Sequence, residues 1–184
     1  GNNFGEEGWG AIIAGVCAST VGKISSIDAS YEKIGPSGAK AIGEALRTSV
    51  NGALTSLDLF DNRLCGKYGD QTAGINAIAE ALKVNGALTE LNLSKNMLGR
   101  VAWRGGTYTA EGINAIADAL RVNVVLTEVR ILPEIAPSRR YFFLTVTSVR
   151  CAQLNLYGNN IGTTCGKAIG EALHVNALTE LDLQ

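Results

Sequence analysis

Several residue types and patterns that enzymes and membrane proteins need are scarce or missing in this 184-residue sequence. Aromatic residues make up 6%. A membrane-spanning helix takes about 20 consecutive apolar residues, but the longest apolar run, residues 11–18, is far shorter and includes Gly15. No P-loop, dinucleotide-binding or nucleophile motif is present, and the only histidine, His174, lies near a predicted helix end, where a solvated or capping role fits better than general-base catalysis. We therefore predict no enzymatic activity, no cofactor and no small-molecule substrate.

The sequence also lacks a charge imbalance and any metal-binding spacing of cysteines. Its 16 basic and 17 acidic residues give a net charge of −1, so no overall field favours nucleic acid or a membrane surface as a partner. Cys17, Cys65, Cys151 and Cys165 form no C-x-x-C pair and have no histidine-rich surroundings. Isolated reduced thiols are typical of cytosolic proteins, so we predict a cytoplasmic protein without a metal site.

What the sequence does contain is a repeat. The segment LTSLDLFDNRL at residues 54–64 returns as LTELNLSKNML at residues 88–98. A third copy ends in LNLYGNNI at residues 154–161, a fourth begins as LTELDL at residues 178–183, and a degenerate copy, ISSIDA, lies at residues 24–29 with Glu32 where Asn is expected. In such a motif the second and third leucines point to one side of a short strand and the residue between them to the other. The Asn side-chain amide can bond backbone groups of the neighbouring turn.

Each strand motif is followed by a helical segment: AKAIGEAL at residues 39–46, INAIAEAL at 75–82, INAIADAL at 113–120 and KAIGEAL at 167–173. The first residues fit too, because Phe4 stands eight positions before Ile12 as Ile161 stands before Ile169. Their apolar residues form one stripe per helix, which can cover a strand. No unit buries its face alone, so neighbouring units must supply the stability.

This alternation resembles leucine-rich repeats of the ribonuclease-inhibitor-like type, including NLR-type and Ran GTPase-activating-protein-like repeats. The resemblance covers the chain except residues 129–153. It implies an α/β fold, a leucine-rich-repeat solenoid or horseshoe with a parallel β-sheet on the concave face and α-helices on the convex face. We expect residues 1–184 to form a single domain. Neither end shows the atypical capping unit of a complete array, so we also expect a fragment of a longer one.

The repeat spacing is interrupted near the C-terminal end. It is 30 residues from position 24 to 54, 34 from 54 to 88, 38 from 88 to 126, and 52 from 126 to 178. Deleting residues 129–153, a stretch of 25 residues, restores the motif and a spacing of 27. Valine codons begin with GT and one glutamine codon is CAG, so both borders suit a translated intron. The alternative is a genuine insertion loop or an irregular repeat.

The predicted concave face is the first candidate binding surface. The side chains expected to project from it are Ser26, Asp28, Ser30, Ser56, Asp58, Phe60, Glu90, Asn92, Ser94, Asn155, Tyr157, Glu180 and Asp182. Five of them are carboxylates and none is Lys or Arg. This face is either an ordinary solvated sheet surface or a docking surface for a basic patch on another protein.

The second candidate is an edge formed by two strand-to-helix loops, which are 6 and 10 residues longer than the basic one. They contain Lys67, Tyr68, Arg100, Trp103, Arg104 and Tyr108. Trp, Tyr and Arg are favoured anchors of interfaces, and loops on a rigid scaffold commonly carry function. The alternative is that Trp103 only covers the core of its own loop.

Three functions fit the resemblance. The first is a noncatalytic protein-binding module that uses the concave face, the loop edge or both. The second is a regulator of a small GTPase, since Ran GTPase-activating proteins have similar repeats, although their acidic C-terminal tail is not seen in this sequence. The third is ribonuclease inhibition, but those relatives are much richer in cysteine than this chain with its four thiols.

Overall fold

Helices and strands alternate along the chain in the computed structural model, which describes residues 4–49, 52–66, 71–98, 111–130 and 153–155. The helices are α1 (Gly5–Ala18), α2 (Gly35–Thr48), α3 (Ala73–Leu82) and α4 (Glu111–Val122). The strands are β1 (Ser26–Asp28), β2 (Ser56–Asp58), β3 (Glu90–Asn92), β4 (Glu128–Arg130) and β5 (Gln153–Asn155). Each predicted helical segment within the described residues lies inside its helix, and the degenerate copy at residues 24–29 contains β1.

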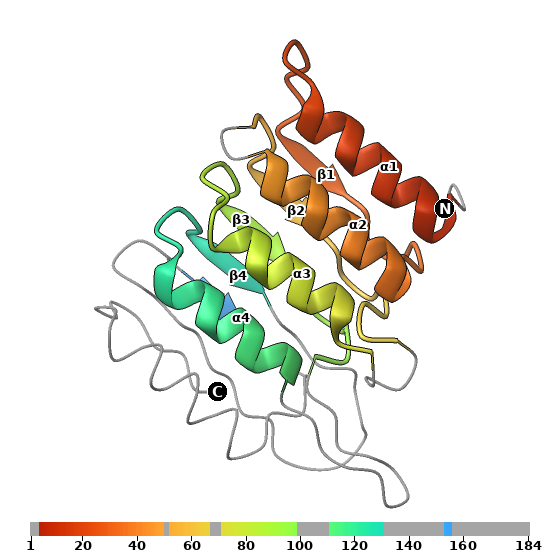
Figure 1. The fold of residues 1–184 in the computed structure, drawn as a ribbon, viewed down its shortest axis with the longest axis vertical. Helices are drawn as coiled ribbons and strands as arrows, with labels where there is room; N and C mark the ends of the chain where they lie inside the picture. The colour runs from red at the N-terminus through yellow and green to blue at the C-terminus, as the bar shows by residue number, and fades with distance from the viewer. Residues whose placement is uncertain (1–3, 50–51, 67–70, 99–110, 131–152, 156–184) are drawn as a thin grey trace, which may run out of the picture.

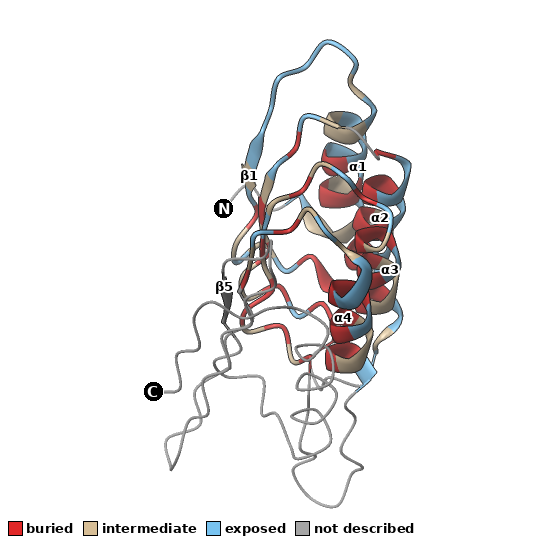
Figure 2. Cartoon of the chain, turned by 90° about the vertical axis from the view of Figure 1, so that its left-hand side faces the viewer, coloured by how far each residue is buried: buried red, intermediate tan, exposed pale blue. Residues whose placement is uncertain are grey.

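The strands form one sheet in the order of the sequence, β1-β2-β3-β4-β5, and every neighbouring pair is parallel. The helices α1 to α4 run side by side on one face of it, as Figures 1 and 2 show from two directions. The strands β1, β2 and β3 are thus each followed by a helix that returns the chain to the same end of the sheet. The predicted α/β class with a parallel sheet is confirmed.

The core lies between the sheet and this single helical layer (Figure 2). Leu57 and Leu91, the central residues of β2 and β3, are each 1% exposed, and the leucines that follow the strands are fully buried. Ile42, Ile78 and Ile116 contribute the matching positions of α2, α3 and α4. Burying a side chain of this size stabilises the fold by about 1.5–3 kcal/mol. The apolar stripe predicted for these helices therefore packs against the sheet and stabilises the two layers.

Adjacent helices approach closely because small residues line their contacts. A Cβ atom on Gly43 of α2 would lie 2.5 Å from the backbone carbon of Ala77 in α3. A Cβ on Gly10 of α1 would lie 2.6 Å from the Cβ of Ala41 in α2. Carbon atoms do not approach this closely, so a larger side chain would force the helices apart.

Helix α1 buries a different isoleucine from the one that the sequence-based alignment indicates. That alignment placed Ile12 in the core at the position of Ile42, but Ile12 is 36% exposed, and Ile13 is fully buried instead. The prediction for Ile12 was wrong by one position. Trp9 and Ile13 are four residues apart and form the buried stripe of this helix. Ile12 and Ile13 are adjacent in the sequence, so helix packing decides which of them is buried.

Two asparagines join successive units at the strand ends, as predicted. Asn62 is fully buried. Its Oδ1 accepts the N–H groups of Glu32 and Ile34 at 3.0 and 3.3 Å, and its Nδ2 donates to the carbonyl of Ala29 at 2.7 Å. Asn96 repeats this one unit later, accepting from the N–H groups of residues 62 and 64. These amides replace backbone partners that the turning chain cannot supply.

The degenerate first unit uses a different contact at this position. Glu32 stands where the later units have asparagine, and its carboxylate accepts the indole N–H of Trp9 at 3.2 Å. Trp9 is 6% exposed, and a buried indole N–H needs such a partner. Glu32, at the position where later repeats have asparagine, therefore links the loop that follows β1 to α1 through this hydrogen bond.

A second set of asparagines, which sequence reasoning did not single out, lies between helix and strand. Asn85 donates to the carbonyls of Leu46 and Ser49 at 2.9 and 3.0 Å and accepts the N–H of Leu88 at 2.8 Å. Asn123 makes the corresponding contacts one unit later. The signal was the Val-Asn pair, which comes three residues before the first leucine-type position in the repeats at 54, 88 and 126.

Residues at both borders of the predicted 129–153 insertion take part in the sheet. Val129 is fully buried in β4, where the register pairs it with Leu91 of β3. Leu154 of β5 pairs in turn with Val129. Val129 and Leu154 therefore hold equivalent positions in successive strands.

Candidate functional site

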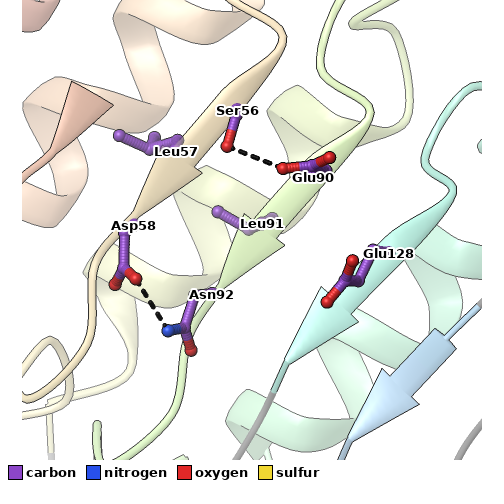
Figure 3. A pocket seen from close by; sticks show the side chains of 7 residues that line it. All are labelled: Ser56, Leu57, Asp58, Glu90, Leu91, Asn92 and Glu128. Carbon is purple, nitrogen blue, oxygen red and sulfur yellow. Dashed lines mark hydrogen bonds between the residues drawn. The ribbon is translucent and has the colours of Figure 1, made fainter. Parts of the chain in front are cut away.

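The open face of the sheet, on the side away from the helices, carries the first predicted set of binding residues. The register aligns Ser56 of β2 with Glu90 of β3 and Glu128 of β4, and it aligns Asp58 with Asn92. These five side chains line a shallow hollow of about 40 Å³, with Leu57 and Leu91 at its floor. Figure 3 shows the polar side chains of three successive strands gathered there. The structure thus brings four predicted residues together: Ser56, Asp58, Glu90 and Asn92.

Hydrogen bonds between strands hold these side chains in place. The hydroxyl of Ser56 donates to Glu90 Oε2 at 2.9 Å, and Nδ2 of Asn92 donates to Asp58 Oδ2 at 3.0 Å (Figure 3). Each bond leaves carboxylate lone pairs available to a further donor. Side chains ordered in advance lose less entropy when they bind a partner. The hollow is therefore an acidic surface whose side chains are held by hydrogen bonds.

The same carboxylates and amide also shape the backbone. Asp28, Asp58 and Asn92 end their strands, and each accepts the N–H of the residue two positions later at 2.8–3.1 Å. The side-chain hydrogen bond from Ser30, and after it the backbone bond, hold the pKa of Asp28 below its ordinary value. An amide at these positions keeps the acceptor oxygen, which makes Asp→Asn the appropriate change for testing their charge.

Two predicted members of this face lie in other surroundings. Phe60 is half-buried and its ring lies against Tyr31 and the ammonium of Lys95. Ser94 was predicted to project into solvent but is fully buried, and its hydroxyl has no hydrogen-bond partner. That prediction was wrong because side chains alternate between the two faces of the sheet only within the strand, which ends at Asn92. The chain turns at Lys95, where φ is 56°.

Glu128 is a member of the hollow that sequence reasoning missed. It occupies the position of Glu90 in the next strand. The repeated Leu-Thr-Glu triplet at residues 88–90 and 126–128 was the available signal. It was passed over because the motif was taken to break off after Glu128.

The remaining predicted contacts lie outside the described residues. They are Tyr157, Glu180 and Asp182 on the face, and Lys67, Tyr68, Arg100, Trp103, Arg104 and Tyr108 on the loop edge. For Asn155 the backbone is described, in β5 beside Arg130, but the side chain is not. These residues stay predictions.

The described part of the chain offers no metal site. No three His, Cys, Asp or Glu side chains come together there in a way that could hold an ion. Its two cysteines, Cys17 and Cys65, are free thiols, and burial raises the pKa of both. None of the described helices has the length and apolarity required to cross a bilayer.

Comparison with known proteins identifies no relative. The chain matches no protein-family model and none of the curated proteins. The hollow on the open face of the sheet is therefore the observation on which a function can be argued.

Proposed function

We propose that this chain is a noncatalytic protein-binding module. In this proposal it is a leucine-rich-repeat solenoid of the ribonuclease-inhibitor-like type, and the open face of the sheet is its concave side. The proposal is supported by the alternation of helix and strand from α1 to β4, the in-register parallel strands and the asparagines that join successive turns. A partner protein with a basic patch binds the hollow.

The single observation that carries the binding proposal is the composition and order of the hollow. Asp58, Glu90 and Glu128 supply three carboxylates from three strands, and none of the described residues that line the hollow is basic. Arg130 is the register partner of Asn92, and its side chain lies outside the described part of the structure. A Lys or Arg side chain that enters between β2 and β4 can contact all three strands. Charge-assisted hydrogen bonds to carboxylates are about twice as strong as neutral ones.

The shape of the site favours a protein over a small molecule. A hollow of about 40 Å³ is far below the 300–1,000 Å³ typical of pockets for drug-sized ligands. A single projecting side chain fits, and the flat sheet around it can contact the surface that presents it. Electrostatic complementarity of this kind mainly sets specificity and the association rate.

The test compares proteins captured from native lysate by three forms of the full chain. The face variant carries Asp28→Asn, Asp58→Asn and Glu90→Gln, which remove three charges. Each amide keeps one acceptor oxygen, for the bond from Ser30, Phe60 or Ser56. At position 58 an amide nitrogen replaces the second oxygen, so the bond from Asn92 is lost. The matched control carries Glu7→Gln, Glu44→Gln and Asp118→Asn, which remove three charges from exposed helix positions. Captured proteins are quantified by mass spectrometry at low and raised salt.

We expect a partner captured by the wild type and the control but lost from the face variant, with capture weakened by salt. A small GTPase among such partners would favour the regulatory alternative. Equal capture by all three forms would contradict binding at this face. The loop edge would then be tested with Trp103→Ala and Arg104→Ala.

A further inference from the structure

A second surface lies beside the hollow, where the chain leaves the strands and turns towards the helices. The ladder of backbone bonds continues into these turns, since Tyr31 N–H donates to the Phe60 carbonyl at 2.9 Å and Asp61 N–H to the Ser94 carbonyl at 3.0 Å. Tyr31, Asp61 and Lys95 therefore hold equivalent positions in three successive units. All three have positive φ, between 52° and 61°. The turns are thus regular and repeat at the spacing of the strands.

An exposed aromatic pair lies in these turns. Tyr31 is 63% exposed, the most exposed aromatic side chain among the described residues. Its ring meets the half-buried ring of Phe60 edge to face, with centroids 5.1 Å apart. The ammonium of Lys95 lies 5.1 Å from the centroid of the Phe60 ring, within the range of a cation–π contact. The pair offers an apolar surface held in place on two sides.

Two further cations follow the aromatic residues in the same two turns, Lys33 two residues after Tyr31 and Arg63 three residues after Phe60. Lys33 and Arg63 each lie five residues after register partners, Asp28 and Asp58, so they hold equivalent positions in neighbouring turns. Both side chains are exposed and both residues have φ of 56°. Among the described residues the two ion pairs are Lys83–Glu80 and Arg121–Asp118, both within helices. The positive charges of Lys33 and Arg63 therefore face solvent from neighbouring turns. The half-buried Lys95 adds a third positive charge, over the Phe60 ring.

Left-handed backbone conformations restrict these side chains further. A residue with a Cβ atom adopts positive φ only at a steric cost, and Gly or Asn usually occupies such sites. Here one such position of successive turns holds Tyr31, Asp61 and Lys95, and a second holds Lys33, Arg63 and Met97. The turn conformation explains the backbone, but not the choice of large aromatic and basic side chains. An interface does explain it, since Tyr and Arg are the residue types enriched among interface anchors.

We propose that Tyr31, Lys33, Phe60, Arg63 and Lys95, the aromatic–basic edge, form a docking surface for an acidic polypeptide segment with an apolar or aromatic side chain. Carboxylates of the segment meet Lys33, Arg63 and Lys95, and its apolar side chain packs on the rings of Tyr31 and Phe60. The surface is separate from the acidic hollow, and its partner has the opposite charge. It therefore goes beyond the proposed function.

Negatively charged residues close to the aromatic–basic edge favour a polypeptide over a nucleic acid as its partner. Asp61 lies within the turns, and Asp28 and Asp58 end the strands that lead into them. A nucleic acid carries a charge at every phosphate, so it would bring phosphates close to these carboxylates. A peptide can place its few carboxylates on the three cations and keep neutral groups elsewhere.

The experiment uses fluorescence anisotropy with the full chain and a short labelled peptide of Glu-Glu-Phe repeats. The site variant is Lys33→Glu with Arg63→Glu. The matched control is Lys40→Glu with Arg47→Glu, which makes the same charge change at two exposed positions of α2. Circular dichroism and thermal unfolding check the fold of each form, and Lys33→Gln with Arg63→Gln replaces the site variant if that variant unfolds.

We expect the site variant to bind the peptide at least about tenfold more weakly than the wild type, and the control to stay within about twofold. Tyr31→Asn, which suits positive φ, should weaken binding of the Glu-Glu-Phe peptide more than binding of a Glu-Glu-Ser peptide. The proposal would be overturned if the site variant bound the peptide as tightly as the wild type, or if the control lost as much affinity as the site variant. It would also be overturned if the wild type did not bind the peptide. Tighter binding of a single-stranded oligonucleotide than of the peptide would also overturn it.

The two surfaces can be tested apart. The face variant with Asp28→Asn, Asp58→Asn and Glu90→Gln should bind the acidic peptide at least as well as the wild type, because it removes negative charge near the edge. Loss of peptide binding in this variant would contradict separate surfaces. Failure of the acidic peptide to bind the wild type would leave the proposed function of the hollow untouched.

Discussion

The backbone N–H of Asn62 donates to Oδ1 of Asn96 at 2.9 Å. Asn96 comes from the next repeat, 34 residues later, so a side chain of one unit completes the backbone bonding of the unit before it. Asn62 serves Glu32 and Ile34 of the preceding unit in the same way. We therefore expect the stability of each turn to depend on the turn that follows it. This dependence is the physical basis of cooperativity along the stack.

Replacing Asn62 with Ala should lower the free energy of unfolding by about 3 kcal/mol. The side chain is fully buried and makes four hydrogen bonds, to residues 29, 32, 34 and 60, and buried backbone groups left without partners are costly. Asn76→Ala, which loses one exposed bond to Glu111, should cost less than about 1 kcal/mol. Urea unfolding of both variants measures the difference. Similar costs would contradict a stabilising role for the buried asparagine.

Two glycine-to-alanine changes in helices should have opposite effects. Gly43→Ala places a Cβ atom 2.5 Å from the backbone of Ala77, so α2 and α3 must separate, and we expect a loss of about 1–3 kcal/mol. At Gly15 in α1 a Cβ meets nothing within 4 Å, so Gly15→Ala should stabilise the protein by about 0.5–1 kcal/mol through helix propensity. Thermal unfolding gives both signs. A stabilising Gly43→Ala would show that the helices are not in close contact.

Cys65 should resist alkylation in the native protein. Burial, and to a smaller extent the charge of Glu111, raises the pKa of its thiol from 9.0 to about 12, and only the thiolate reacts. Iodoacetamide at mildly alkaline pH should therefore modify Cys65 only after denaturation, as mass spectrometry of its peptide would show. Rapid labelling of the folded protein would contradict the burial.

The same shift predicts a pH dependence of stability. The folded-state pKa of Cys65 lies above the unfolded value, so the thiol's contribution is complete below pH 9 and is lost as pH rises towards about 12. Cys65→Ala should show a smaller fall in unfolding free energy over this window. Denaturant titrations at several pH values compare the two slopes, and equal slopes would exclude this thiol as the cause.

Deleting residues 129–153 should give a protein that folds with higher thermal stability. The deletion joins Glu128 to Leu154, and Leu154 then takes the buried position that Val129 holds beside Leu91. It also returns Asn159 to the position, five residues after that leucine, that Asn96 holds after Leu91. Differential scanning calorimetry compares the two chains. A lower melting temperature would show that the stretch is an integral part of the fold, and sequencing the transcript would test its origin directly.

Much of the fold could be predicted because the information is local and repeated. Ile42, Ile78 and Ile116 hold the same position in three similar helical segments, which indicates the face of each helix that is buried. The position of Asn62 after its strand indicates a side chain that serves a neighbouring turn. The second asparagine set, Asn85 and Asn123, was equally visible in the sequence but was not recognised, because the role of these residues depends on where the preceding helix ends.

The acidic hollow was predicted in part. Asp58, Glu90 and Asn92 follow from strand alternation, which is a property of the backbone. Ser94 could not be placed in this way, because alternation stops where the chain turns. Contacts such as Ser56 with Glu90 depend on the register between strands 34 residues apart, and no local pattern specifies that register alone.

By itself the sequence determined the repeating strand–helix order, the identity of the buried leucines and isoleucines from β2 to α4, and the asparagine positions after the strands. These follow from periodicity, which acts within one unit. Only the tertiary structure decided that α1 buries Ile13 rather than Ile12, that Glu32 binds Trp9, and that Glu128 joins Asp58 and Glu90 in one hollow. Each of these depends on how one unit packs on the next, and packing selects among side chains that local periodicity leaves equivalent.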